Sequence, residues 1–146
     1  MRRVVVSEAA IDVAGEFKCL REAIHDSAGA IASFLGVVRG GDVTSLELQH
    51  HPRMTEASIL RIVDEAEQRW KLSGVTVIHR VGVLDPGDDI VLVLAAAGHR
   101  PEAFEACEFL MDYLKTEAVF WKRELRGEQA AWVESTGKDH RRARRW

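Results

Sequence analysis

The chain has 146 residues, of which 47% are hydrophobic and 29% are charged. A chain of this length buries roughly 70% of its unfolded surface, enough for one core without disulfides or metals. With only 11 glycines and 3 prolines, the composition excludes disordered and fibrous proteins. No apolar run approaches the roughly 18 residues that a membrane span needs, so no membrane association is expected. A short apolar stretch at the amino terminus and two cysteines without a disulfide framework predict a cytoplasmic protein.

Charge is distributed unevenly along the chain. The net charge is −3, and residues 138–145 carry five positive charges and one negative, so the rest of the chain carries −7. A general nucleic-acid-binding protein presents a broad basic face, and the acidic body argues against one. We therefore predict one domain over residues 1–136 and a basic tail over 137–146. The tail is either a solvated end or a local phosphate contact.

Hydrophobic periodicity predicts the elements of the first third of the chain. A short strand is expected at Val4–Val6, followed by a helix over Ile11–Ile24 with apolar residues at helical spacing. Residues 29–39 form an apolar, strand-like segment that the glycines at 40 and 41 end. Apolar and polar residues alternate over Thr44–His50, which predicts a half-buried strand.

Two long helices separated by strands are predicted in the rest of the chain. The first long helix covers Thr55–Lys71, which has an apolar stripe, and the second opens at Pro101, since proline suits the first helical position. Strands are expected between and after these helices, at Val75–Val81, Ile90–Ala96, Val119–Leu125 and Ala131–Glu134. Because strands and helices do not alternate strictly, the fold class is α+β, with an antiparallel or mixed sheet, two long helices and an N-terminal helix.

Cationic side chains stand at several ends of the predicted elements. They are Arg39, His79, Arg80, His99, Arg100, Lys115, Lys122 and Arg123. If they converge on one cleft, they suit a small anionic substrate that carries a phosphate, because arginine clamps phosphate and lysine acts as nucleophile or acid/base once its pKa falls. The alternative is that each cation pairs with a carboxylate on the surface.

Other combinations of reactive residues are weaker. His50 and His51 are adjacent in a strand and point to opposite faces, so no metal site is predicted. Cys107 lies on the apolar stripe of its helix and is interpreted as a core thiol. Glycine-rich phosphate loops and the Gly-x-Ser-x-Gly motif are absent from the sequence, so nucleotide-dependent enzymes and serine hydrolases have no support.

Ten short segments resemble, in order and spacing, those of the catalytic (large) subunit of molybdopterin synthase. Each segment alone is unspecific, but their ordered set spans nearly the whole chain. The segments are 29–30 (GA), 34–39 (FLGVVR), 46–54 (LELQHHPRM), 75–82 (VTVIHRVG), 86–88 (PGD), 99–100 (HR), 103–106 (AFEA), 111–115 (MDYLK), 120–124 (FWKRE) and 132–134 (WVE).

The resemblance implies an α/β-hammerhead fold and a sulfur-transfer reaction. Members of this family convert a cyclic pyranopterin monophosphate into molybdopterin by installing two sulfurs. The sulfur arrives as a thiocarboxylate on the C-terminal Gly-Gly of a small ubiquitin-like partner subunit. The implied assembly is a heterotetramer around a central homodimer of the large subunit. No nucleic acid, metal or organic cofactor is implied for this subunit.

The resemblance also assigns roles to residues of this chain. Lys115 matches the principal catalytic lysine and Lys122 a second essential lysine. The other substrate-binding residues that it implies are Val37, Val38, Arg39, His99, Arg100, Arg123 and Glu124. Among these, Arg39, His99 and Arg100 match the pocket for the substrate phosphate.

Some positions depart from the family pattern. Val37 replaces a lysine of many relatives, and Thr136 stands in the stretch where some carry an arginine that reaches the neighbouring subunit's pocket. Gln49, His51 and Val119 also differ from the common residues. Two other functions stay open: a non-catalytic homodimeric module that binds a ubiquitin-like tail, and a nucleic-acid-binding domain that uses the basic tail.

Overall fold

The computed structural model describes residues 1–146 as two four-stranded sheets and four helices. In chain order the elements are β1 (Arg2–Ser7), α1 (Val13–Ile24), β2 (Ala30–Val37), β3 (Ser45–His50), α2 (Pro52–Arg69), β4 (Leu72–Arg80), β5 (Gly82–Leu84), β6 (Asp89–Ala97), α3 (Arg100–Thr116), β7 (Phe120–Arg126), β8 (Gln129–Val133) and α4 (Gly137–Ala143). None of the helices is long and apolar enough to cross a membrane.

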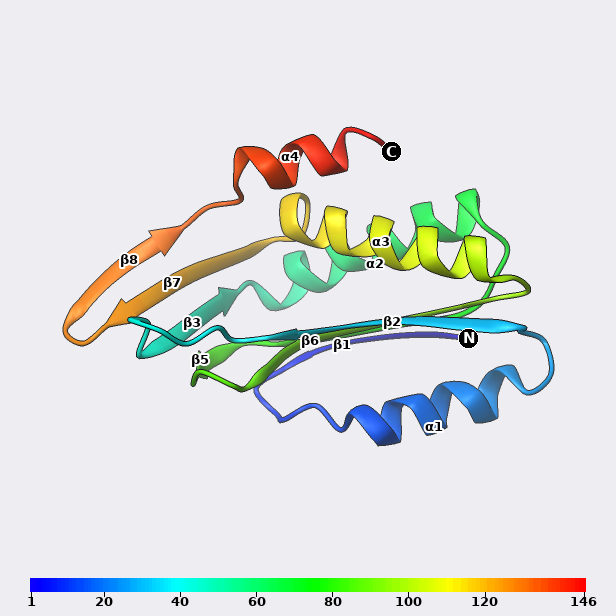
Figure 1. Cartoon of the computed structure of the whole chain (residues 1–146), viewed down its shortest axis with the longest axis horizontal. Helices are drawn as coiled ribbons and strands as arrows, with labels where there is room; N and C mark the ends of the chain where they lie inside the picture. Colours follow the sequence, from blue (N-terminus) through cyan, green and yellow to red (C-terminus); the bar gives the residue numbers. More distant parts are fainter.

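The larger sheet is mixed and has helices on both faces. Its strand order is β1-β4-β6-β2, with β1 parallel to β4 and the other pairs antiparallel. Helix α1 covers one face, and α2 and α3 cover the other (Figure 1). This arrangement confirms the predicted α+β class with a mixed sheet, two long helices and an N-terminal helix.

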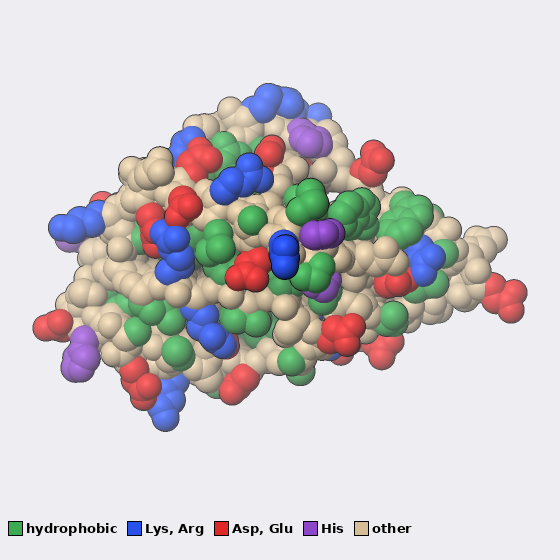
Figure 2. Space-filling model, turned by 180° about the vertical axis from the view of Figure 1, so that it is seen from behind, with side chains coloured by type: hydrophobic (Ala, Val, Ile, Leu, Met, Phe, Trp, Pro, Cys, Tyr) green, Lys and Arg blue, Asp and Glu red, His purple; other side chains and the backbone are tan.

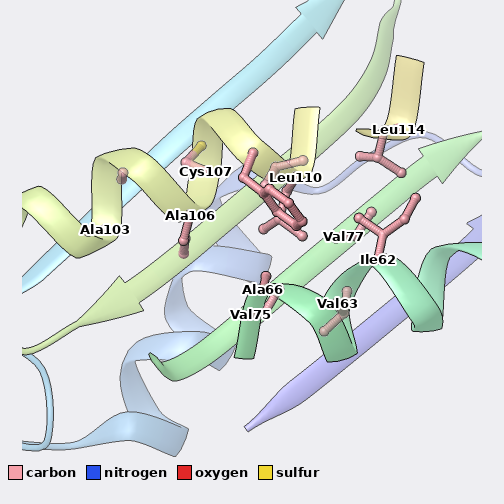
Figure 3. Close-up of a cluster of buried hydrophobic side chains, with 14 of the residues drawn as sticks. Ile62, Val63, Ala66, Val75, Val77, Ala103, Ala106, Cys107, Leu110 and Leu114 are labelled. Carbon is pink, nitrogen blue, oxygen red and sulfur yellow. The ribbon is translucent and has the colours of Figure 1, made fainter. Parts of the chain in front are cut away.

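The main core lies between the larger sheet and helices α2 and α3. Alternate residues of β4 point toward these helices, and the small side chains Ala66 and Ala106 let the layers approach closely (Figure 3). Cys107 is buried in this core, as predicted from its place on the apolar stripe. The side chains that Figure 3 labels are Ile62, Val63, Ala66, Val75, Val77, Ala103, Ala106, Cys107, Leu110 and Leu114.

Helix α2 begins three residues earlier than the predicted start at Thr55. The Nδ1 atom of His51 accepts a hydrogen bond from the backbone N–H of Met54 at 3.2 Å, so His51 caps the helix. Pro52 then occupies the first turn, where its missing N–H costs nothing. His51 therefore has a structural role as the cap of α2.

The smaller sheet is antiparallel, with strand order β5-β3-β7-β8. Its hairpin of β7 and β8 projects from one end of the molecule (Figure 1). Gly127 makes the hairpin turn at φ +62°, a backbone conformation that favours glycine. Strand β5 was not predicted, because three residues are too short to show alternation.

The basic tail folds back onto α3, which differs from the predicted solvated end. Thr136 caps α4 in a reciprocal arrangement with Asp139. Nε of Arg142 donates to Oδ1 of Asp112 at 3.2 Å, and Nε1 of Trp146 donates to Oδ2 of the same carboxylate at 2.8 Å. Carboxylates of α3 thus hold the tail against the body of the molecule.

Candidate active site

A cavity of about 1370 Å³ opens where the two sheets meet. The end of β2, the last turn of α3, strand β7 and the segment that leads into α4 line it. Six residues that the family resemblance implied lie in this lining: Val37, Val38, Arg39, Lys115, Lys122 and Glu124. Residues 85 positions apart in the sequence therefore share one cavity.

Strand alternation separates Lys122 from its neighbour Arg123. Side chains of successive strand residues point to opposite faces, so Lys122 faces the cavity while Arg123 does not line it. Arg123 forms an ion pair with Glu47, its register partner on β3, and lies 5.4 Å from the centre of the Trp132 ring. In this chain Arg123 therefore has a packing role outside the cavity.

Lys115 reaches the cavity from the last turn of α3. The carbonyl groups at a helix C-terminus favour a cation there. Val38 approaches from the other side, where its N–H donates to the carbonyl of Asp88 at 2.9 Å and its carbonyl accepts from the N–H of Gly87 at 2.8 Å. These bonds fix the backbone immediately before Arg39.

Three cations of the cavity have no carboxylate partner. Arg39, Lys115 and Lys122 form no ion pair. Arg126, which also lines the cavity, is by contrast neutralised by Asp42 at 2.8 Å and Glu124 at 2.7 Å.

These pairings divide the predicted cations. The alternative, in which each cation pairs with a surface carboxylate, holds for Arg80, which pairs with Asp88 at 3.7 Å, and for Arg123, but it fails for the three that stay unpaired. Glu124, which the resemblance implied as a substrate-binding residue, accepts a hydrogen bond from Arg126.

The pKa of Lys122 lies below its ordinary value of 10.5. Burial is the largest cause, because it disfavours the charged ammonium, and the positive charge of Lys115 adds to it. Glu124 and Asp139 act in the opposite direction and offset only part of the shift. A larger fraction of Lys122 is therefore neutral amine near neutral pH than for an exposed lysine.

His79 lines the cavity as an uncharged residue, although the sequence grouped it with the cations. Burial, together with the charges of Lys115 and Lys122, lowers its pKa from 6.5 to about 4. Its ring stacks on Phe120 with centroids 4.1 Å apart. The prediction that His79 could converge on one cleft with the cations was correct. The periodicity did not reveal the burial that removes the charge of His79.

His99 and Arg100 lie at the opposite end of α3 from Lys115. His99 is the N-cap residue of the helix, and Arg100 is its first residue. The helix rises 1.5 Å per residue, so Arg100 and Lys115 are about 22 Å apart along its axis. His99 lines a second, smaller hollow with Arg69 and Lys71. One chain therefore does not bring all the predicted anion-binding residues together.

The face of the molecule that Figure 2 shows carries no broad basic patch. Acidic and basic side chains are interspersed there, which disfavours nucleic-acid binding by this face. In the tail, Arg142 and Arg145 form ion pairs with Glu108 and Asp112. The structure contains no group of three or more metal-ligating side chains.

Comparison with known proteins agrees with the geometry. The family model described as "MoaE protein" matches residues 6–117. The chain is 51% identical to the molybdopterin synthase catalytic subunit of Ralstonia nicotianae, over all of this chain and 85% of that protein. It is 48% identical to the subunit of that name from Escherichia coli, over 99% of this chain and 97% of that protein.

A solved structure shows the same fold. The molybdopterin biosynthesis MoaE protein from Burkholderia ambifaria superposes with a TM-score of 0.87 at 42% identity, covering 100% of this chain and 98% of that one. The family match covers most of the chain, and the relatives match it nearly end to end. The chain belongs to the MoaE family, the family of molybdopterin synthase catalytic subunits.

Proposed function

We propose that the chain transfers sulfur to a cyclic pyranopterin monophosphate and so forms the dithiolene of molybdopterin. The observation that carries this proposal is the group of three unpaired cations, Arg39, Lys115 and Lys122, in one cavity. Cations without carboxylate partners suit an anionic substrate, and they also stabilise negative charge that develops during the reaction. The names of the relatives, molybdopterin synthase catalytic subunit, support the same chemistry.

The sulfur donor is the thiocarboxylated C-terminal Gly-Gly of a small ubiquitin-like partner subunit, which enters the same cavity. In each transfer the thiocarboxylate sulfur forms a bond to a carbon of the pterin side chain as a carbon–oxygen bond of that carbon breaks, and the oxygen leaves on the opening phosphate ester or as water. Hydrolysis then breaks the bond between the sulfur and the acyl carbon of the carrier. Water supplies the oxygen that restores the carboxylate of the carrier. Two such transfers install the two sulfurs. The free cysteines of the chain fit a reducing, cytoplasmic setting for thiolate chemistry.

The two lysines differ in their surroundings and therefore in their roles. Lys115 is exposed, so we assign it to the incoming tail and to the negative charge at the carbonyl under attack. Lys122 is half-buried and its pKa is lowered, so we assign it to proton transfer as a neutral amine. Arg39 holds the phosphate, and Val37 and Val38 line the cavity beside it.

A second copy of the chain completes the anion site in this proposal. His99 and Arg100 are about 22 Å from Lys115 along α3, so they contact the same substrate only when a neighbouring copy supplies them. The homodimer that the family resemblance implied provides such a copy. The cavity of one copy then faces the start of α3 in the other.

The test is product formation by the purified chain with the thiocarboxylated partner and cyclic pyranopterin monophosphate. We expect dithiolene product from the parent, a loss of at least about a hundredfold for Lys115→Ala, and a loss of at least about tenfold for Lys122→Ala, because removal of a proton-transfer or charge-stabilising group costs that much. Lys18→Ala is the matched control, since Lys18 is exposed on α1 and forms only a 3.9 Å pair with Glu22.

Each negative outcome has a distinct meaning. No product from the parent, together with a stable complex with the partner, would favour the non-catalytic module. Full activity of Lys115→Ala would refute the role of that lysine.

A further inference from the structure

Lys122 has no anionic partner, although two carboxylates lie near it. Glu124 accepts from Nη2 of Arg126 at 2.7 Å, and Oδ2 of Asp139 accepts from the N–H and hydroxyl of Thr136, each at 2.8 Å. Neither carboxylate is within 4.0 Å of the Lys122 ammonium. The three donors of this half-buried amine are therefore free for water or for an uncharged acceptor of the cavity.

His79 lies where it can supply that acceptor. Phe120 and Lys122 are two residues apart on β7, so their side chains point to the same face of the strand. The His79 ring stacks on Phe120, at 4.1 Å and 26° between the planes. The imidazole therefore lies on the face of β7 from which Lys122 extends, the charge of Lys122 acts on it, and both residues line the cavity.

The hydrogen bonding of His79 fixes which of its nitrogens is free. Nδ1 lies 2.8 Å from the carbonyl oxygen of Arg80. A carbonyl oxygen can only accept, so Nδ1 of the neutral ring carries the proton and Nε2 keeps a lone pair. Nε2 makes no hydrogen bond within the chain. It is also not one of the fully buried polar atoms that lack a partner, so it is accessible to solvent. The lone pair is thus open to the cavity.

We propose that His79 is a positioning residue whose Nε2 accepts a hydrogen bond from Nζ of Lys122 and so orients this amine in the cavity. The inference rests on the proposed function of the same site and deepens it. The flexible stem of lysine lets Nζ turn toward the ring. An uncharged acceptor orients the amine without the strong preference for the ammonium form that a carboxylate would impose.

Three variants separate the acceptor from the packing of the ring. His79→Phe keeps an aromatic ring on Phe120 and removes the acceptor. His79→Gln supplies an uncharged amide oxygen in its place. Thr76→Val is the matched control, because Thr76 is buried on the same strand and its hydroxyl has no partner. The other charged groups that act on Lys122 are unchanged in all three: Lys115 on α3, Arg39 after β2, Glu124 on β7 and Asp139 on α4.

The first measurement needs no substrate. Competitive acetylation of the intact chain with acetic anhydride across pH, followed by mass spectrometry, reports the pKa and the reactivity of Lys122. A hydrogen bond accepted from the ammonium favours the charged form, so we expect a lower midpoint for Lys122 in His79→Phe than in the parent. His79→Gln restores the parent profile, and Thr76→Val does not change it. Identical profiles in the parent and His79→Phe would overturn the proposal.

The second measurement is the single-turnover rate of sulfur transfer with saturating partner and pterin. We expect His79→Phe to lose about tenfold in rate, the size of one lost hydrogen bond to a reacting group, with substrate affinity unchanged. His79→Gln should recover to within about threefold of the parent, and a rate of His79→Phe equal to that of the parent would also overturn the proposal. If the parent makes no product but the acetylation profiles behave as expected, the proposed function fails and the role of His79 stands.

Discussion

Acidification is expected to destabilise the fold through His79. In the unfolded chain its imidazole takes up a proton near pH 6.5, whereas burial keeps the folded ring neutral down to a pKa of about 4. The unfolded state therefore binds more protons between these values, and stability is lost as the pH falls through this window. At 1.36 kcal/mol per unit, the full effect is about 3 kcal/mol, of which about 2 kcal/mol falls between pH 6.5 and 4.5.

Urea unfolding of the parent and His79→Gln at several pH values measures this effect. Glutamine does not titrate, and the carboxylates that titrate in the same range are common to both chains. The free energy of unfolding of the parent, relative to that of the variant, should therefore fall by about 2 kcal/mol from pH 6.5 to pH 4.5. Parallel pH profiles for the two chains would refute the burial of an uncharged imidazole at this position.

Three further predictions concern the core, the tail and the thiols. Phe109 is fully buried and contacts Trp146 edge to face. Phe109→Ala should therefore lower the free energy of unfolding by about 3–5 kcal/mol in urea titrations. A loss under about 1 kcal/mol would contradict its central place in the core. Trp146→Ala removes two edge-to-face aromatic contacts and should cost about 1–3 kcal/mol by thermal unfolding, whereas an unchanged midpoint would mean that the tail is not docked. Burial raises the pKa of Cys107 to about 11, so its thiolate fraction at pH 8 is roughly a hundredfold below that of an ordinary thiol. Iodoacetamide should therefore modify the exposed Cys19 and leave Cys107 unmodified until the chain unfolds.

Local patterns predicted the long elements of the fold and missed two short ones, β5 and α4. Both long helices and the strands between them carry enough residues to show a period, and the observed bounds differ by one to three residues. Strand β5 is three residues long and is held by pairing with β3, which lies 32 residues or more earlier in the chain. The capping pair of Thr136 and Asp139 was a local signal for α4 that the run of positive charge obscured.

Family motifs and local geometry predicted part of the candidate site. The motifs led to Arg39, Lys115 and Lys122, which the fold brings into one cavity. Strand alternation agrees with the place of Arg123 outside the cavity, but it was not sufficient to predict it, because Trp121 also adjoins Lys122 and lines the cavity. The separation of Arg100 from Lys115 follows from the length of one continuous helix. Ion pairing was not predictable, because Arg126 meets its partner Asp42 only across 84 residues of sequence.

The order of the strands has a consequence for how the chain emerges from a ribosome. Strand β1 pairs with β4, β2 with β6, and β3 with β5 and β7, so none of the first three strands pairs with another of them. Only β7 and β8 form a local hairpin. The first three strands therefore have no sheet partner until β4 has been synthesised, and the larger sheet is complete only with β6. Such non-local pairing is associated with slow folding, in milliseconds to seconds, and leaves the apolar strand β2 open to aggregation during synthesis.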